Sequence, residues 1–459
     1  MKTRYWLAII AAIIAFSLLC ANLPRKNATL TVMVDGSIKY QKIDGFGGSG
    51  AYWEGLLRNL QEPKRTEAAS LLFSDLGLSI YRLRTWTKIE HVNDDGDPNH
   101  FNWEAFNFDT DEDQVWNAIQ ARNRGITKFI ASVWSPPEWM KNTGKETNGG
   151  YLLPSMYREF AEWLAAYVIG YQTHHGINIG WISIQNEPNW VADWETCTYT
   201  PLQMRDVIKV VGAKFSAEGI STEIVIPETT GSSNAPEFIS TIMSDPEAAK
   251  YVEVFANHLY DTSFFNPDER ISSLQAVAGY GTLYNKPIWQ TEYSYLETAD
   301  AGTFREALFS AHHIHNVLTF ENGSAYLVWE LFWYRETGLI SINRDGSKYT
   351  ITPKFYAAKQ YFRFISPGSI RIGVVVNNPS ILVSAYMNEI NGNVTIVAIN
   401  QGQTLITTSF NLKNVATASF KQYRTSVSEN CAYIGEIAVS NNSFNVDLPS
   451  ESVTTLAAA

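Results

Sequence analysis

Two glutamates carry the strongest chemical signal in this sequence. Glu187 lies in an Asn-Glu-Pro motif and Glu292 in a Thr-Glu-Tyr motif, and each ends an apolar, strand-like run. They are about 105 residues apart, the length of three strand–helix repeats of about 35 residues in a (β/α)8 barrel. The strand ends of such a barrel converge on one face, where two carboxyls can cleave a glycosidic bond, one as proton donor and one as nucleophile. The pair therefore predicts a glycoside hydrolase.

The segments around these glutamates alternate between strand-like and helical patterns. Alternation of this kind implies a parallel sheet, and eight repeats imply an α/β fold that closes into a (β/α)8 TIM barrel, here over residues 43–366. The predicted strands are 43–47, 78–84, 127–134, 181–185, 223–227, 252–260, 287–291 and 325–329.

The pattern changes at residue 367. Residues 367–459 contain short alternating runs, separated by Asn and Gly turns, which predict a C-terminal β-sandwich. The stretch 30–34 also alternates, precedes the barrel and has no helix partner. We therefore expect residues 27–42 to supply N-terminal strands to the sandwich, which makes that domain discontinuous in sequence.

Composition and the N-terminus narrow the class of protein. The chain of 459 residues is 45% hydrophobic with a formal net charge of −11, which suits a large core and argues against a duplex nucleic-acid binder, because such proteins need clustered Lys and Arg. Residues 1–26 have the basic start, short apolar run and polar end of a signal peptide. We expect a secreted or extracytoplasmic protein, attached to a membrane only if this segment is retained as an anchor. Of the three cysteines, only Cys197 and Cys431 would remain after removal of this segment, which is too few for a disulfide scaffold.

Four motifs, in order along the chain, resemble those of glycoside hydrolase family 30. They are Ile43–Gly50, Trp134–Met140, Gln185–Pro188 and Thr291–Tyr293. The resemblance extends from about Thr29 to the C-terminus. It implies a (β/α)8 barrel with an attached β-sandwich and a retaining β-glycosidase, in agreement with the pattern of strands and glutamates.

The family pattern makes Glu187 the general acid/base and Glu292 the nucleophile. Asn186 would hydrogen-bond the sugar 2-hydroxyl, a contact that strengthens in the transition state. Arg84, at the end of the second predicted strand, is a candidate to hold Glu292 ionised through a bidentate pair, with a structural ion pair at the barrel rim as the alternative. Tyr260 ends the sixth predicted strand and is a candidate donor to Glu292, with packing at the rim as the alternative.

Aromatic side chains near strand ends are candidate walls for a sugar. Trp134 and Trp329 end the third and eighth predicted strands, and their rings could stack on sugar C–H faces. Trp53 and Trp333 are weaker candidates, because an aromatic residue more often serves packing. The histidines 312, 313 and 315 do not share a helical face at metal-ligand spacing, so we expect no metal site and no cofactor.

The residues around the motifs look more like those of the polysaccharide-degrading branches of the family than those of the glucosylceramide-degrading ones. An endo-acting xylanase is our first choice for a β-linked polysaccharide or oligosaccharide substrate. A β-1,6-glucanase or galactanase is the second, and a glucosylceramidase-like β-glucosidase is a further alternative. An alternative of another class is a carbohydrate-binding barrel without activity, which the presence of both glutamates disfavours.

A requirement for glucuronic acid side groups is left open by the sequence. Family branches with that requirement use a basic and aromatic cluster after the eighth strand, where this chain has Trp333 and Arg335. The register differs from that pattern, and Arg335 can instead pair with Glu330 or Glu336.

Overall fold

The predicted barrel is present in the computed structural model, which describes residues 30–459. Eight parallel strands pair in sequence order, and the first also pairs with the last, so the sheet closes. The proposed signal segment, residues 1–26, lies outside the described residues. The barrel strands are β2 (Gly45–Ser49), β3 (Ile80–Arg84), β4 (Lys128–Ser132), β5 (Ile179–Ser183), β6 (Glu223–Thr229), β7 (Val252–His258), β8 (Ile288–Glu292) and β9 (Ala325–Val328).

The inside of the barrel has an apolar floor beneath a polar layer. Ile80, Ile130, Val225 and Trp289 are buried in one apolar cluster to which six of the strands contribute. Side chains on one face of a strand recur every two residues, and two residues after Ile80 the buried side chain is Arg82. The change from apolar to polar therefore occurs at the C-terminal ends of the strands, where barrel enzymes have their active sites.

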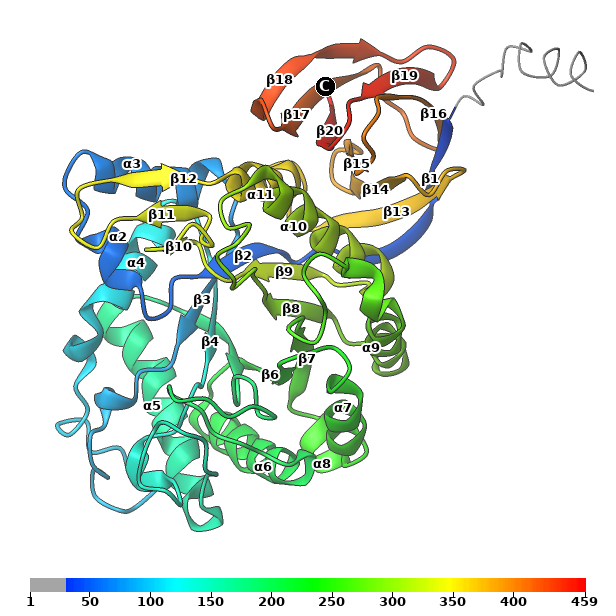
Figure 1. Cartoon of the computed structure of the whole chain (residues 1–459). Helices are drawn as coiled ribbons and strands as arrows, with labels where there is room; N and C mark the ends of the chain where they lie inside the picture. Colours follow the sequence, from blue (N-terminus) through cyan, green and yellow to red (C-terminus); the bar gives the residue numbers. More distant parts are fainter. Residues whose placement is uncertain (1–29) are drawn as a thin grey trace, which may run out of the picture.

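Helices surround the barrel (Figure 1). Helix α6 illustrates how the sequence sets their ends: Thr200 and Gln203 form a reciprocal capping box at its start, and Gly219 ends it in the left-handed conformation (φ 67°). The helices are α2 (Glu54–Arg58), α3 (Lys64–Ser70), α4 (Glu112–Asn123), α5 (Tyr157–His175), α6 (Pro201–Glu218), α7 (Ala235–Met243), α8 (Pro246–Ala249), α9 (Ile271–Tyr284), α10 (Phe304–Asn316) and α11 (Pro353–Phe362).

The C-terminal region is a nine-stranded sheet that folds over on itself as a sandwich. Its strand order is β18-β17-β20-β15-β14-β13-β1-β16-β19. Phe420 of β17, near one end of this order, packs on Phe444 of β19 at the other end, with ring centroids 4.9 Å apart. The strands are β1 (Leu30–Lys42), β13 (Ser369–Val376), β14 (Ile381–Asn388), β15 (Val394–Asn400), β16 (Ile406–Lys413), β17 (Ser419–Ser426), β18 (Glu429–Ala438), β19 (Ser443–Leu448) and β20 (Ser452–Ala458).

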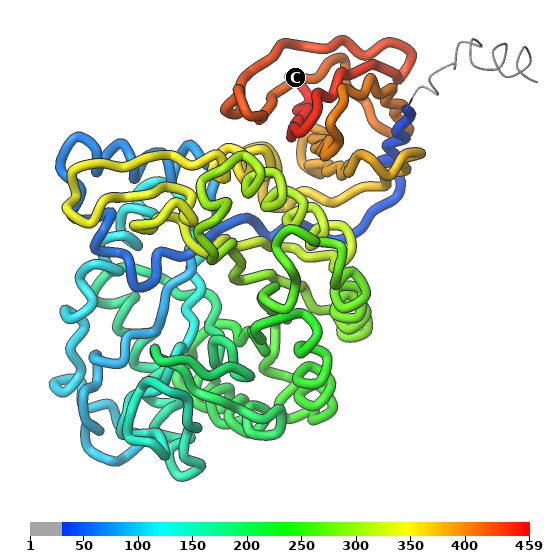
Figure 2. The backbone as a smooth tube through the Cα atoms, viewed as in Figure 1, coloured from blue at the N-terminus to red at the C-terminus, as the bar shows by residue number. Residues whose placement is uncertain are grey.

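The expected N-terminal contribution to the sandwich is confirmed. Strand β1 runs antiparallel to β13 and parallel to β16, so the first described residues lie inside the last domain. Figure 2 shows this blue segment beside the gold β13 before it continues into the barrel. Val32 and Val34 of β1 are fully buried in the sandwich core, which accounts for the alternation seen in the sequence.

The two domains share a contact surface. Helices α10 and α11 lie between the barrel and the sandwich (Figure 1), and Gln360 of α11 donates to Thr425 (2.8 Å) and accepts from Thr455 (2.7 Å). A small sheet of β10 (Phe332–Trp333), β11 (Ile340–Ile342) and β12 (Tyr349–Ile351) follows the last barrel strand.

Within residues 30–459, no helix combines the length and the apolar character that crossing a membrane requires. Over the same residues Cys197 is buried, Cys431 is half-buried, and both thiols are free.

Candidate active site

A cavity of about 890 Å³ lies over the C-terminal ends of the barrel strands. Both predicted catalytic glutamates line it, together with Asn186 and Tyr260. A cavity of this size can bury a ligand of several rings. Six tryptophans complete much of its wall: Trp53, Trp134, Trp190, Trp194, Trp329 and Trp333.

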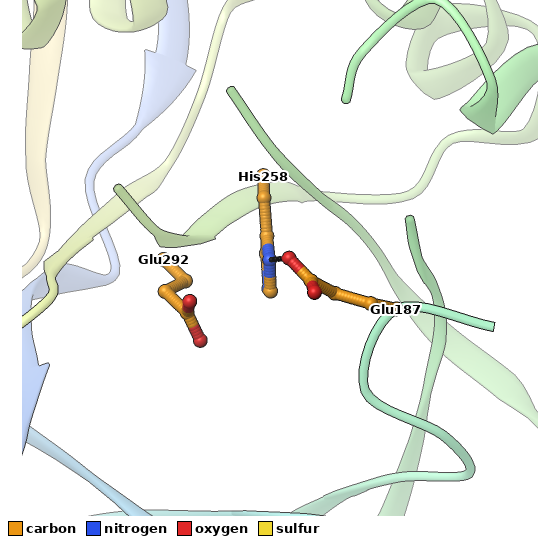
Figure 3. Close-up of side chains that lie close together, drawn as sticks. All are labelled: Glu187, His258 and Glu292. Atoms are coloured by element: carbon orange, nitrogen blue, oxygen red, sulfur yellow. Dashed lines mark hydrogen bonds and ion pairs between the residues drawn. The ribbon is translucent and has the colours of Figure 1, made fainter. Parts of the chain in front are cut away.

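The two carboxyls face one another across this cavity. An oxygen of Glu187 and an oxygen of Glu292 lie within 4.8 Å of each other and of a ring nitrogen of His258, and Figure 3 shows the three side chains converging. Retaining glycosidases need about 5–5.5 Å between their carboxyls, and inverting ones about 6.5–9.5 Å. The spacing therefore fits direct attack on the sugar by one carboxylate.

The loop that carries Glu187 has an unusual backbone. Glu187 (φ 50°) and Glu228 (φ 55°) both adopt the left-handed conformation, which costs free energy for a residue other than glycine. The amide of Glu187 donates to the carbonyl of Glu228 at 2.9 Å. This bond connects the loop after β5 to the end of β6 and fixes the position of the Glu187 backbone.

Arg82 is the residue that pairs with Glu292. Its Nη1 donates to Oε2 of Glu292 at 2.7 Å, and its Nη2 donates to Oδ1 of Asn186 at 2.7 Å. The same guanidinium forms an ion pair with Glu228 at 3.0 Å, and its Cζ lies 4.5 Å from the ring centroid of Trp134. One buried cation therefore positions the Glu292 carboxylate and its neighbours.

The role predicted for Arg84 is wrong. Arg84 instead lies within ion-pair distance of Glu54 (3.3 Å) and Asp111 (3.5 Å), outside the cavity that holds Glu292. Two residues of strand advance a side chain by about 6.6 Å, so the side chain level with Glu292 is that of Arg82. The alternative given for Arg84, a structural ion pair at the rim, describes what the structure contains.

The predicted contact of Tyr260 with Glu292 is present. The Tyr260 hydroxyl donates to Oε1 of Glu292 at 2.9 Å, and burial together with the charge of Glu292 raises its pKa well above the usual value, so it remains a donor. Asn186 accepts from Arg82 through Oδ1, which leaves its amide NH2 for the cavity. That orientation suits donation to a sugar hydroxyl.

His258 and Glu228 extend this cluster behind Glu187. Nδ1 of His258 lies 2.9 Å from Oε1 of Glu187, and its Nε2 lies 3.9 Å from Oε1 of Glu228. Burial lowers the pKa of His258, but the charge of Glu292 and the hydrogen bond to Glu187 outweigh it and raise the pKa to about 9. For Glu228, burial is likewise outweighed, and Arg82 and His258 lower its pKa to about 2.

The charges of the cluster leave room for one mobile proton. Three carboxylates, those of Glu187, Glu228 and Glu292, face two cations, Arg82 and protonated His258, and all are buried. Burial and the charge of Glu187 raise the pKa of Glu292, while His258 and Arg82 oppose this. Glu292 already accepts from two donors, which leaves Glu187, the other carboxyl at the cavity, to act as the acid.

The rings of the predicted sugar walls do meet at the cavity. Trp134 and Trp329 lie with centroids 5.9 Å apart, and Trp53 and Trp333 also lie 5.9 Å apart. Arg335 does not line the cavity. Its guanidinium lies over the ring of Trp333 at 5.5 Å, and within residues 30–459 it has no carboxylate within ion-pair distance.

Three residues of the cluster escaped sequence reasoning: Arg82, Glu228 and His258. Each had a usable signal. Glu228 directly follows the fifth predicted strand, residues 223–227, and His258 lies two residues before Tyr260. Arg82 lies on the same strand as Arg84 and has the same inward parity.

Glu187, His258 and Glu292 also have the spacing of three metal ligands. Metal ligation requires a neutral imidazole, whereas the raised pKa of His258 keeps its ring protonated. Arg82 further occupies one oxygen of Glu292. The donor set therefore suits an acid–base cluster better than a cation.

Comparison with known proteins accords with this geometry. The model of O-glycosyl hydrolase family 30 matches residues 29–333, which carry both glutamates and the barrel around them. The chain belongs to this family. It is an O-glycosyl hydrolase with the barrel and sandwich seen in solved family 30 structures.

Among family 30 relatives, Glucuronoxylanase XynC of Bacillus subtilis (strain 168) is 30% identical over 435 residues, covering 93% of this chain and 92% of that protein. The solved family 30 subfamily 8 xylanase Xyn30A from Clostridium acetobutylicum is 30% identical with a TM-score of 0.75, covering 94% of this chain and 100% of that one. A family 30 endoxylanase from Clostridium papyrosolvens C71 is 28% identical with a TM-score of 0.76, covering 93% of this chain and 99% of that one.

Proposed function

We propose that this family 30 enzyme hydrolyses internal β-linkages of a xylan-type polysaccharide with net retention of configuration. The observation that carries the proposal is the pair of carboxyls within 4.8 Å inside an aromatic-lined cavity. The relatives at about 30% identity are named for xylan chemistry, which supports the substrate class.

The contacts of each glutamate assign it one step. Glu292, held by Arg82 and Tyr260, attacks the anomeric carbon, and Glu187 gives its proton to the leaving oxygen, which forms a glycosyl-enzyme. Glu187 then takes a proton from water, and the resulting hydroxide equivalent releases the sugar with a second inversion. His258 orients Glu187 through the 2.9 Å contact between Nδ1 and Oε1.

Exposed aromatic side chains support a polymeric substrate. Trp190 and Trp194, on the connection from β5 to α6, line the cavity yet are each 51% exposed. Exposed tryptophans of this kind can stack on sugar units that extend beyond the carboxyl pair. This arrangement favours an endo-acting enzyme.

We further propose that a glucuronic acid side group is not required. Among the residues that line the cavity there is no lysine or arginine, so the cavity offers no full positive charge for a uronate. Arg335, the candidate from the sequence, stacks on Trp333 and Tyr334 instead.

A panel of polysaccharides tests both proposals. Release of reducing ends should be fastest with xylan, and unsubstituted xylan and glucuronoxylan should give kcat/KM values within about tenfold, a difference of about 1.4 kcal/mol. NMR of the first products should show the β-anomer. Preference for β-1,6-glucan, galactan or glucosylceramide would replace the substrate, absence of turnover on every member would favour a binding protein, and dependence on glucuronate would contradict the second proposal.

Export follows from the same substrate, because a polysaccharide does not cross a membrane. Residues 1–26 have the pattern of a signal segment, and we propose that they direct the enzyme out of the cytoplasm. N-terminal sequencing of the protein recovered outside expressing cells should begin after this segment, whereas recovery only with membranes would identify an anchor.

A further inference from the structure

Four acidic side chains converge away from the catalytic cavity. Glu90 and Asp94 belong to the connection between β3 and α4, and Glu159 and Glu162 lie one turn apart on α5. One carboxylate oxygen each from Asp94, Glu159 and Glu162 lie within 4.8 Å of one another. Glu90 joins them because its Oε1 accepts from the amide of Asp94 at 3.0 Å.

Four of the eight carboxylate oxygens lie buried without a partner in the described part of the chain, while both oxygens of Asp94 accept from backbone amides, those of Asp95 and Asn102. Glu162 is 0% exposed and Glu90 is 1% exposed. Within residues 30–459, neither oxygen of Glu162 accepts a hydrogen bond, and Oε2 of Glu159 and Oε2 of Glu90 are likewise unsatisfied. A buried carboxylate without a partner costs several kcal/mol, so the cluster calls for protons or a cation.

No basic side chain of the described residues neutralises the cluster. The two nearby candidates are engaged elsewhere. Lys214 pairs with Glu218 at 2.8 Å and lies over the ring of Phe101, and Arg158 donates to Asn99 at 2.8 Å. None of the four acidic side chains forms an ion pair with a lysine or arginine of residues 30–459.

We propose that Glu90, Asp94, Glu159 and Glu162 bind a calcium ion. The donors are all carboxylate oxygens, the ligands that hard cations prefer. Calcium binds oxygen at about 2.3–2.6 Å, so two ligands of one ion are at most about 5.2 Å apart, and the three oxygens, all within 4.8 Å of one another, meet this condition. Magnesium needs a near-ideal octahedron at about 2.0–2.1 Å and usually keeps several waters, so a site built from four carboxylates on a loop and a helix suits calcium better.

The ion would fasten the β3–α4 connection to α5. That connection also contacts the loop after β4: Lys88 pairs with Glu146 at 2.8 Å, and the Trp139 ring lies 3.5 Å from the carbonyl of Glu90. Calcium would therefore stabilise two of the loops on the C-terminal face of the barrel. The inference does not depend on the substrate proposed above.

Calorimetry and thermal unfolding of the full chain test this site. After removal of metals with chelator, CaCl2 alone should titrate one site and should raise the melting temperature by about 3 °C at a hundredfold excess over its dissociation constant. MgCl2 and NaCl of equal ionic strength should have much smaller effects. Glu162→Gln should weaken calcium binding at least tenfold, and Glu104→Gln, a change of an exposed glutamate on the same connection, should bind as the wild type does.

A reversal of stability distinguishes a metal ligand from an ordinary structural residue. In chelator, Glu162→Gln should melt no lower than the wild type because it removes a buried charge, and in calcium the wild type should melt higher. If Glu162→Gln does not fold, Asp94→Asn takes its place in the same titration. Absence of calcium heat and of a melting shift in the wild type, or unchanged binding in a folded variant, would show that the carboxyls hold protons and would overturn the proposal.

Discussion

Replacement of Arg82 by lysine tests whether Arg82, as in the structure, positions Glu292, and not Arg84, as the sequence suggested. The guanidinium reaches Glu292, Asn186 and Glu228 at once, at 2.7, 2.7 and 3.0 Å. A lysine keeps the charge, but its single ammonium group cannot contact all three partners in the plane of a guanidinium. We expect Arg82→Lys to fold and to release the Glu292 carboxylate from its fixed orientation.

The size of the effect follows from the bond that is lost. A hydrogen bond between charged groups contributes about 1.5–3 kcal/mol, and 1.36 kcal/mol in the barrier is tenfold in rate. Loss of the bond to Glu292 should therefore lower kcat/KM by about 10- to 150-fold. Because Arg82 opposes the rise in the pKa of Glu292, the acid limb of the pH–rate profile should also move to higher pH.

Arg84→Lys is the matched control, since it makes the same change two residues further along β3. Its partners are Glu54 and Asp111, so kcat/KM should fall less than tenfold and the acid limb should stay in place. Rates on xylan between pH 3 and 9 measure both variants, with circular dichroism to verify the fold. Equal losses for the two variants, or a shifted acid limb only in Arg84→Lys, would refute the assignment of Arg82.

Two more predictions concern the proton cluster. Glu292→Gly and Glu187→Gly should each lose several orders of magnitude in kcat. Added azide should restore turnover of an activated β-glycoside, giving the α-glycosyl azide with Glu292→Gly, by one inversion, and the β-glycosyl azide with Glu187→Gly, by two inversions. If the anomeric configurations of the two products were the reverse, the roles of the two glutamates would be exchanged. The raised pKa of His258 in the folded protein, about 9 against an ordinary 6.5, means that its stabilisation is complete below pH 6.5 and is lost as the pH rises through 9. Between these pH values the free energy of unfolding, measured with denaturant, should fall by about 3 kcal/mol more in the wild type than in His258→Gln, and parallel curves would show that His258 is neutral.

The barrel was predictable because its strands are buried on both faces and are therefore almost continuously apolar. Each observed strand lies within about two residues of its predicted bounds, and β1 was evident from its strict alternation. The catalytic pair was likewise evident, since the ends of parallel strands share one face whatever the details of their pairing.

The level of a side chain above the barrel floor was not predictable in the same way. Arg82 and Arg84 lie on the same face of their strand. Only the register between strands, such as the pairing of Arg82 with Ile130, decides which of the two lies at the height of Glu292 in the barrel. Glu228 was missed for a local reason. The prediction ended that strand at Pro227, whereas β6 continues through an irregular pairing to Thr229, and the left-handed Glu228 lies at that irregularity.

The position of β1 in the sheet has a consequence for how the chain is made. Its partner β13 lies roughly 330 residues further along the chain, which at about 5–20 residues per second takes roughly 15–70 s to synthesise. Through that interval the apolar side of β1 has no sheet to join, while the eight barrel strands are synthesised one after another. An element at the start of the chain is thus among the last to settle, and a chaperone that shields this short strand would protect the nascent enzyme at its most aggregation-prone stage.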